Sequence, residues 1–122
     1  MATEEYFNKA IDWAKNKGIT GIKANCEGFE QPTVFTAVGG EEPITPDVTG
    51  KKFDSKIYIE IATKTDDVRR QVSKWKLLST IAEMKGGKLI LLAPKGHKAF
   101  TEQILKRHNL DNTQLYYLPS IK

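Results

Sequence analysis

The segment PDVTGKKFDSKIYIEIATK, residues Pro46 to Lys64, carries the pattern from which we predict the fold. Its second half, KIYIEIATK (56–64), alternates apolar and polar residues, which is typical of a β-strand. Its first half belongs to a second expected strand, ITPDVTGKK (44–52), and a turn around Lys51–Ser55 joins the two. The segment therefore predicts a hairpin in which Asp47 lies beside Glu60.

The phase of the predicted strand KIYIEIATK (56–64) indicates which of its side chains share a face. Because side chains alternate along a strand, Ile57, Ile59, Ile61 and Thr63 belong to one face, which we expect to pack under a helix. The opposite face is expected to carry Tyr58, Glu60, Ala62 and Lys64.

A carboxylate in the middle of a strand is costly unless it has a partner. Asp47 and Glu60 repel each other when both are charged, and a divalent cation such as Mg²⁺ or Mn²⁺ relieves that repulsion with hard oxygen ligands. A turn-forming role for Asp47 and an ion pair of Glu60 with Lys64, Lys51 or Lys52 are the simpler alternatives.

The rest of the chain predicts an α/β domain. We expect helices at 3–17 (capped by Thr3), 66–84 (capped by Thr65) and 96–110, and strands at 18–29, 44–52, 56–64, 88–94 and 113–119. Residues 30–43 are hard to interpret, and a short strand at Thr33–Val38 or a loop fits them equally. The predicted order is α-β-β-β-α-β-α-β, a single domain over 1–122 with a three-layer mixed β-sheet flanked by helices.

Composition and charge narrow the classes of function. No apolar run approaches the roughly 20 residues that cross a bilayer, and the N-terminus lacks a signal-peptide core, so we expect a cytoplasmic protein that does not bind membranes. Residues 1–61 carry 7 basic and 10 acidic side chains, whereas residues 62–122 carry 12 basic and 5 acidic. This asymmetry indicates either a polyanionic partner or lysines that solvate helix faces.

The dipeptide Pro46-Asp47, a hairpin, and Glu60 within a hydrophobic strand together resemble the PD-(D/E)xK nuclease superfamily, which has the restriction-endonuclease-like fold. The resemblance implies that Asp47, Glu60 and the backbone carbonyl of Ile61 bind Mg²⁺ or Mn²⁺ for phosphodiester hydrolysis in DNA. It also implies a further metal ligand on the first helix, Glu4 or Glu5, and either a homodimer or a subunit of a larger assembly.

One position departs from the superfamily pattern, because Ala62 stands where the pattern has its lysine. Lys64 on the same strand face is our predicted catalytic lysine, and Lys74 from the following helix is the substitute. We predict that this helix contacts nucleic acid through Arg69, Arg70, Gln71 and Lys74. Two alternatives stay open: a catalytically silent nuclease-fold module that binds nucleic acid or a protein, and a plain α/β interaction domain without the Asp47–Glu60 pairing.

Overall fold

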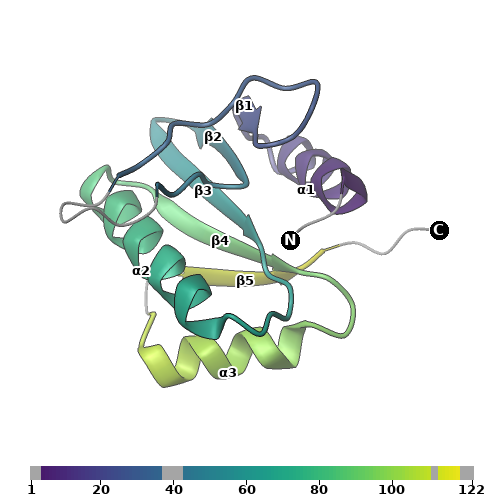
Figure 1. Cartoon of the computed structure of the whole chain (residues 1–122). Helices are drawn as coiled ribbons and strands as arrows, with labels where there is room; N and C mark the ends of the chain where they lie inside the picture. The colour runs from purple at the N-terminus through teal and green to yellow at the C-terminus, as the bar shows by residue number, and fades with distance from the viewer. Residues whose placement is uncertain (1–3, 37–42, 111–112, 119–122) are drawn as a thin grey trace.

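The chain folds into three helices and five strands over the residues that the computed structural model describes, namely 4–36, 43–110 and 113–118 (Figure 1). The helices are α1 (Glu4–Asn16), α2 (Val68–Met84) and α3 (Lys98–His108). The strands are β1 (Thr20–Ala24), β2 (Val48–Lys52), β3 (Ser55–Ile61), β4 (Lys88–Ala93) and β5 (Thr113–Tyr117). The order α1-β1-β2-β3-α2-β4-α3-β5 confirms the predicted one.

The strands form one mixed sheet in the order β1-β2-β3-β4-β5. Strands β1, β2 and β3 are antiparallel neighbours, whereas β3, β4 and β5 run parallel to one another. Strand β3 has a neighbouring strand on each side and helices over both of its faces, so every residue from Ile57 to Ile61 is buried. This central position makes the carboxylate of Glu60 a feature that needs a physical explanation.

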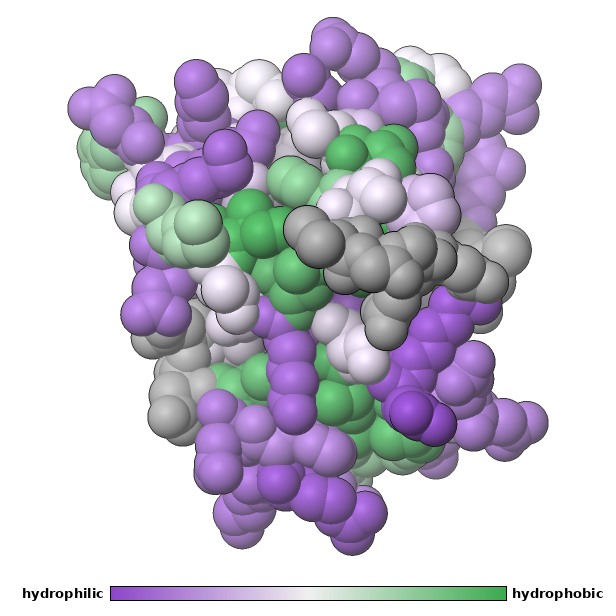
Figure 2. Space-filling view, turned by 60° about the vertical axis from the view of Figure 1, so that its left-hand side comes forward, coloured by the Kyte–Doolittle hydropathy of each residue, from purple (hydrophilic) through white to green (hydrophobic). Residues whose placement is uncertain are grey.

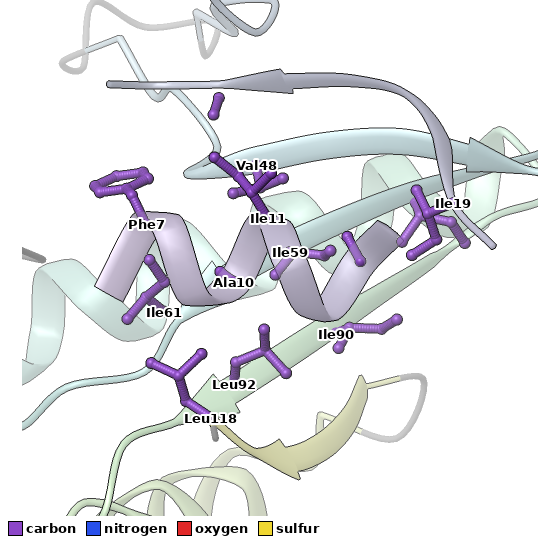
Figure 3. Packing of buried hydrophobic residues seen from close by; sticks show 13 residues of the cluster. Phe7, Ala10, Ile11, Ile19, Val48, Ile59, Ile61, Ile90, Leu92 and Leu118 are labelled. Carbon is purple, nitrogen blue, oxygen red and sulfur yellow. The ribbon is translucent and has the colours of Figure 1, made fainter. Parts of the chain in front are cut away.

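Helix α1 covers one face of the sheet (Figure 3). Its apolar stripe of Phe7, Ala10, Ile11 and Ala14 is buried, as its helical spacing predicts. This stripe packs with Ile57, Ile59 and Ile61 of β3 and with Ile90 and Leu92 of β4. The predicted set of inward isoleucines is therefore confirmed.

Helices α2 and α3 cover the opposite face (Figure 1). The buried residues of α2 are Val72, Trp75, Leu78 and Ala82. They pack with Tyr58 and Ala62, which lie on the face opposite to the isoleucines of β3, and with Leu89 and Leu91 of β4. None of the helices in the described ranges is long and apolar enough to span a membrane.

Several predicted boundaries were wrong: β1 ends at Ala24 instead of Phe29, β2 begins at Val48 instead of Ile44, and β3 ends at Ile61 instead of Lys64. Helix α2 begins at Val68 instead of Asp66, and its cap is Asp67, whose side chain accepts a hydrogen bond of 3.2 Å from the Arg70 N–H. Thr65 instead accepts a hydrogen bond from the Asp67 N–H. For Thr33–Val38, where the sequence fits a short strand or a loop, the described part holds an isolated bridge between Phe35 and Ile44 and otherwise a loop; residues 37–38 lie outside the described ranges. Thr3, the predicted cap of α1, also lies outside them.

Candidate active site

Asp47 and Glu60 face each other across the first antiparallel hairpin. The register pairs Val48 with Ile59, which places the preceding Asp47 opposite the following Glu60. Val48 and Ile59 belong to the core under α1. Because neighbouring residues of a strand point to opposite faces, Asp47 and Glu60 project toward α2.

Each carboxylate is held by a backbone N–H of the facing segment. The Asp47 N–H donates to Glu60 Oε2 over 2.7 Å, and the Ile61 N–H donates to Asp47 Oδ2 over 2.9 Å. These two hydrogen bonds continue the strand pairing at the point where β2 begins. They leave one oxygen of each carboxylate, Asp47 Oδ1 and Glu60 Oε1, without a backbone donor.

Both remaining oxygens point to one cation, the ammonium of Lys74 on α2. Its Nζ atom lies 3.0 Å from Glu60 Oε1 and 3.7 Å from Asp47 Oδ1. The Glu60 side chain is 3% exposed, whereas the Lys74 side chain is 27% exposed. Lys74 therefore forms the solvent-accessible side of a buried ionic cluster, which we call the Asp47–Glu60–Lys74 triad.

Burial and mutual repulsion shape the ionisation of the triad. Burial, followed by the charge of Asp47, raises the pKa of Glu60 to about 8, and burial also raises the pKa of Asp47. Burial alone would lower the pKa of Lys74, but the two carboxylates outweigh it and raise that pKa. One ammonium cannot neutralise two carboxylates, which is why the pKa of Glu60 stays raised in spite of its contact with Lys74.

Gln71 attaches the start of α2 to the end of β3. Its Nε2 atom donates a hydrogen bond of 3.3 Å to the carbonyl of Thr63. Its Oε1 atom is buried and has no hydrogen-bond partner among the described residues. Gln71 lies three residues before Lys74, on the same side of the helix. The contact with Thr63 therefore positions the turn of α2 from which Lys74 reaches the carboxylates.

The predicted catalytic lysine, Lys64, lies elsewhere. Strand β3 ends at Ile61, and the Lys64 N–H donates a hydrogen bond of 2.8 Å to Nδ1 of His97, just before α3. The Lys64 side chain is exposed and forms no ion pair with Asp47 or Glu60 within the described ranges. The tie to His97 joins residues 33 apart, and no motif in the sequence announces it.

The predicted nucleic-acid-binding residues of α2 divide into two groups. Arg69 and Arg70 are exposed in the first turn of α2. Gln71 and Lys74 instead turn toward the end of β3 and the two carboxylates. Position 62, where the superfamily pattern has a lysine, holds a fully buried alanine that packs among residues of α2, so this side of the sheet leaves no room for a long side chain there.

The donor atoms of the triad fit a hard divalent cation such as Mg²⁺ or Mn²⁺ better than a soft metal. One carboxylate oxygen of Asp47 and one of Glu60 converge on the position that the Lys74 ammonium occupies. Mg²⁺ commonly binds proteins through one or two carboxylates and keeps several waters. No group of three or more His, Cys, Asp or Glu residues in the described ranges is arranged to hold a metal ion. Glu4 and Glu5 are exposed on α1 and add no such third ligand.

Comparison with known proteins does not assign the chain to a family. The chain matches no protein-family model, no curated protein sequence and no solved structure at a significant level.

Proposed function

We propose that this protein is a metal-dependent phosphodiesterase of restriction-endonuclease-like fold that acts on DNA. One observation carries the proposal: Asp47 just before β2, Glu60 of β3 and Lys74 of α2 converge at the carboxyl end of β3. Two carboxylates can hold the cation that assists phosphodiester hydrolysis, and a lysine can orient the attacking water.

Asp47 and Glu60 would hold Mg²⁺ or Mn²⁺, with the carbonyl of Ile61 as the third protein oxygen. When bound, the cation polarises the phosphodiester and lowers the pKa of a coordinated water. The backbone N–H groups of Asp47 and Ile61 keep the carboxylates oriented, so little rearrangement precedes binding.

Lys74 takes the role that the superfamily pattern gives to a lysine at position 62. Its ammonium touches both carboxylates and is the member of the triad most open to solvent, so it can contact the scissile phosphate or the attacking water. Arg69 and Arg70, exposed one turn earlier on α2, are placed to bind flanking phosphates.

Cleavage of supercoiled plasmid and branched DNA with Mg²⁺ or Mn²⁺ tests the proposal. We expect Glu60→Gln to abolish cleavage, because the neutral amide cannot replace the anionic ligand. Glu83→Gln, which changes an exposed glutamate on α2, is the matched control and should cleave like wild type. Cleavage that survives Glu60→Gln would overturn the mechanism.

The second candidate is a catalytically silent module, favoured by the position of the Lys74 ammonium. Because this ammonium already contacts both carboxylates and Glu60 can keep its proton, the triad is a complete structural cluster without any metal. DNA binding that is unaffected by Mg²⁺, together with no cleavage of any substrate, would support this candidate.

A further inference from the structure

The turn between β2 and β3 presents an exposed phenylalanine in an unfavourable backbone conformation. Phe53 is 92% exposed, and its φ of 56° lies in the left-handed region that bulky residues rarely adopt. Two-residue hairpin turns favour Gly, Asn or Asp at such positions. Neither packing nor turn preference explains an aromatic side chain here, and such outliers are retained mainly where they serve a function.

Lysines surround this turn on both strands. Lys51 and Lys52 end β2, and Lys56, the second residue of β3, lies opposite Lys51 in the sheet register. Burial, followed by the charges of Lys23, Lys51 and Lys85, lowers the pKa of Lys56. Of these, Lys23 is paired with Glu30 at 3.2 Å. The remaining charges form a basic surface that favours an anionic partner.

The end of α2 lies beside the same turn. The backbone at Gly87 approaches Lys56 so closely that a methyl group at Gly87 would overlap the Lys56 carbonyl. Lys85, the residue that caps the end of α2, therefore lies near the hairpin, and its charge contributes to the lowered pKa of Lys56. The left-hand side of Figure 1, where α2 ends and β4 begins, comes forward in Figure 2, which shows hydrophilic side chains around smaller hydrophobic patches.

We propose that this hairpin surface, formed by Lys51, Lys52, Phe53, Lys56 and Lys85, binds single-stranded nucleic acid. Phe53 stacks on an unpaired base, and the lysines contact the phosphates on either side. A protruding aromatic ring with flanking ammonium groups is how proteins bind single strands without reading their sequence.

The carboxylate of Asp54 argues against insertion of this surface into a membrane. Asp54 follows Phe53 directly in the turn and is exposed. Insertion of Phe53 into lipid would bring this carboxylate toward the apolar phase and the anionic headgroups, at a large energetic cost. Base stacking leaves the Asp54 carboxylate in water, where it can accept a hydrogen bond from a base amino group.

The hairpin surface is distinct from the Asp47–Glu60–Lys74 triad. Lys56 lies four residues before Glu60 on β3, which corresponds to about 13 Å along the strand. Binding at the hairpin requires no metal and can be measured in the presence of a chelator. The inference therefore stands or falls separately from the proposed cleavage.

The test uses the full chain, a chelator and a fluorescently labelled dT oligonucleotide of about 16 nucleotides. Phe53→Ala should lower the affinity about tenfold, the loss typical of one stacked base. Tyr117→Ala, which removes another exposed aromatic ring on β5, should leave the affinity unchanged. Equal affinities of wild type and Phe53→Ala would overturn the proposal.

Phe53→Trp identifies the class of partner. We expect the introduced indole to be quenched by the oligonucleotide, after subtraction of the wild-type signal from Trp13 and Trp75, and to respond little to a duplex of equal length. A blue shift with phosphatidylserine vesicles and no response to the oligonucleotide would instead assign the surface to membranes and overturn the proposal. Equal quenching by single strand and duplex would also overturn it.

Discussion

The backbone N–H of Asp47 donates a hydrogen bond of 2.7 Å to Oε2 of Glu60. The carboxylate of Asp47 in turn accepts from the N–H of Ile61, which follows Glu60 in β3. The pairing of the hairpin thus orients both acidic side chains, and the second oxygen of each carboxylate contacts the ammonium of Lys74. A site with this preorganisation responds to pH, metal and mutation in ways that a surface ion pair does not.

The first prediction concerns the pH dependence of stability. The pKa of Glu60 is raised from its ordinary value of 4.5 to about 8 in the folded protein, so between these pH values the folded state holds a proton that the unfolded state has released. The free energy of unfolding should therefore fall as the pH rises from about 4.5 to about 8. Asp47, whose pKa is also raised, acts in the same direction.

Urea denaturation across this range checks the prediction. Glu60→Gln should flatten the decline, because the amide has no proton to lose, and should be more stable than wild type near pH 8. Glu83→Gln on the exposed side of α2 should keep the wild-type slope. A wild-type stability that rises from about pH 5 to about pH 8 would contradict the raised pKa.

The second prediction concerns metal binding. In the proposed function a divalent cation takes the place of the proton on Glu60, so Mg²⁺ should raise the melting temperature more at about pH 8 than at about pH 6, and binding should release protons. Calorimetry in two buffers of different ionisation enthalpy measures this release. Glu60→Gln should show no Mg²⁺-dependent shift. An equal shift in that variant would place the ion outside the triad.

The third prediction separates the two candidate lysines. Lys74→Met should abolish cleavage and lower stability by about 3–5 kcal/mol near pH 8, because it leaves two buried carboxylates without their cation. The loss should shrink at lower pH, where the carboxylates take up protons. Lys64→Met, at an exposed position, should leave stability and cleavage near wild type. If Lys64→Met abolished cleavage and Lys74→Met did not, Lys64 would be the catalytic lysine, as the strand phase predicts.

The residues that the sequence predicted well are those whose role depends on strand phase within the sheet. The alternation of Ile57, Ile59 and Ile61 and the length of the hairpin were enough to place Asp47 opposite Glu60. The same phase rule failed for Lys64, because β3 ends at Ile61 and the chain then turns toward His97. Alternation carries no information once a strand has ended.

Lys74 shows a different limit. The sequence predicts two roles for Lys74, a nucleic-acid contact together with the exposed Arg69 and Arg70, and the substitute catalytic lysine. Its spacing of three residues from Gln71 supports the second role, because it places both side chains on one side of α2. The identity of its partners depends on how α2 crosses the sheet, which periodicity does not determine.

The fourth prediction tests whether the lysine can return to position 62. Ala62 is fully buried against α2, so Ala62→Lys alone should destabilise the protein by roughly 1–3 kcal/mol through overpacking. Combined with Lys74→Ala, which frees space and removes the competing ammonium, the new lysine should recover part of the cleavage lost in Lys74→Ala. Ala62→Met with Lys74→Ala supplies similar bulk without charge and should recover none. Equal activities of the two double variants would show that an ammonium at this place is irrelevant.

The fifth prediction is that Phe53 lowers the stability of the protein and raises its affinity for single-stranded nucleic acid. A bulky residue in the left-handed region costs about 1–2 kcal/mol relative to glycine, so Phe53→Gly should stabilise the protein by about 1 kcal/mol. Asn109→Gly is the control, because Asn109 adopts a similar φ of 52° at the end of α3 and asparagine tolerates this conformation well. The gain in its free energy of unfolding, measured by chemical denaturation, should be smaller.

Phe53→Gly should at the same time weaken binding to the dT oligonucleotide about tenfold, as the loss of one stacked base predicts. A variant that gained stability and kept its affinity would show that the strained phenylalanine serves no binding role.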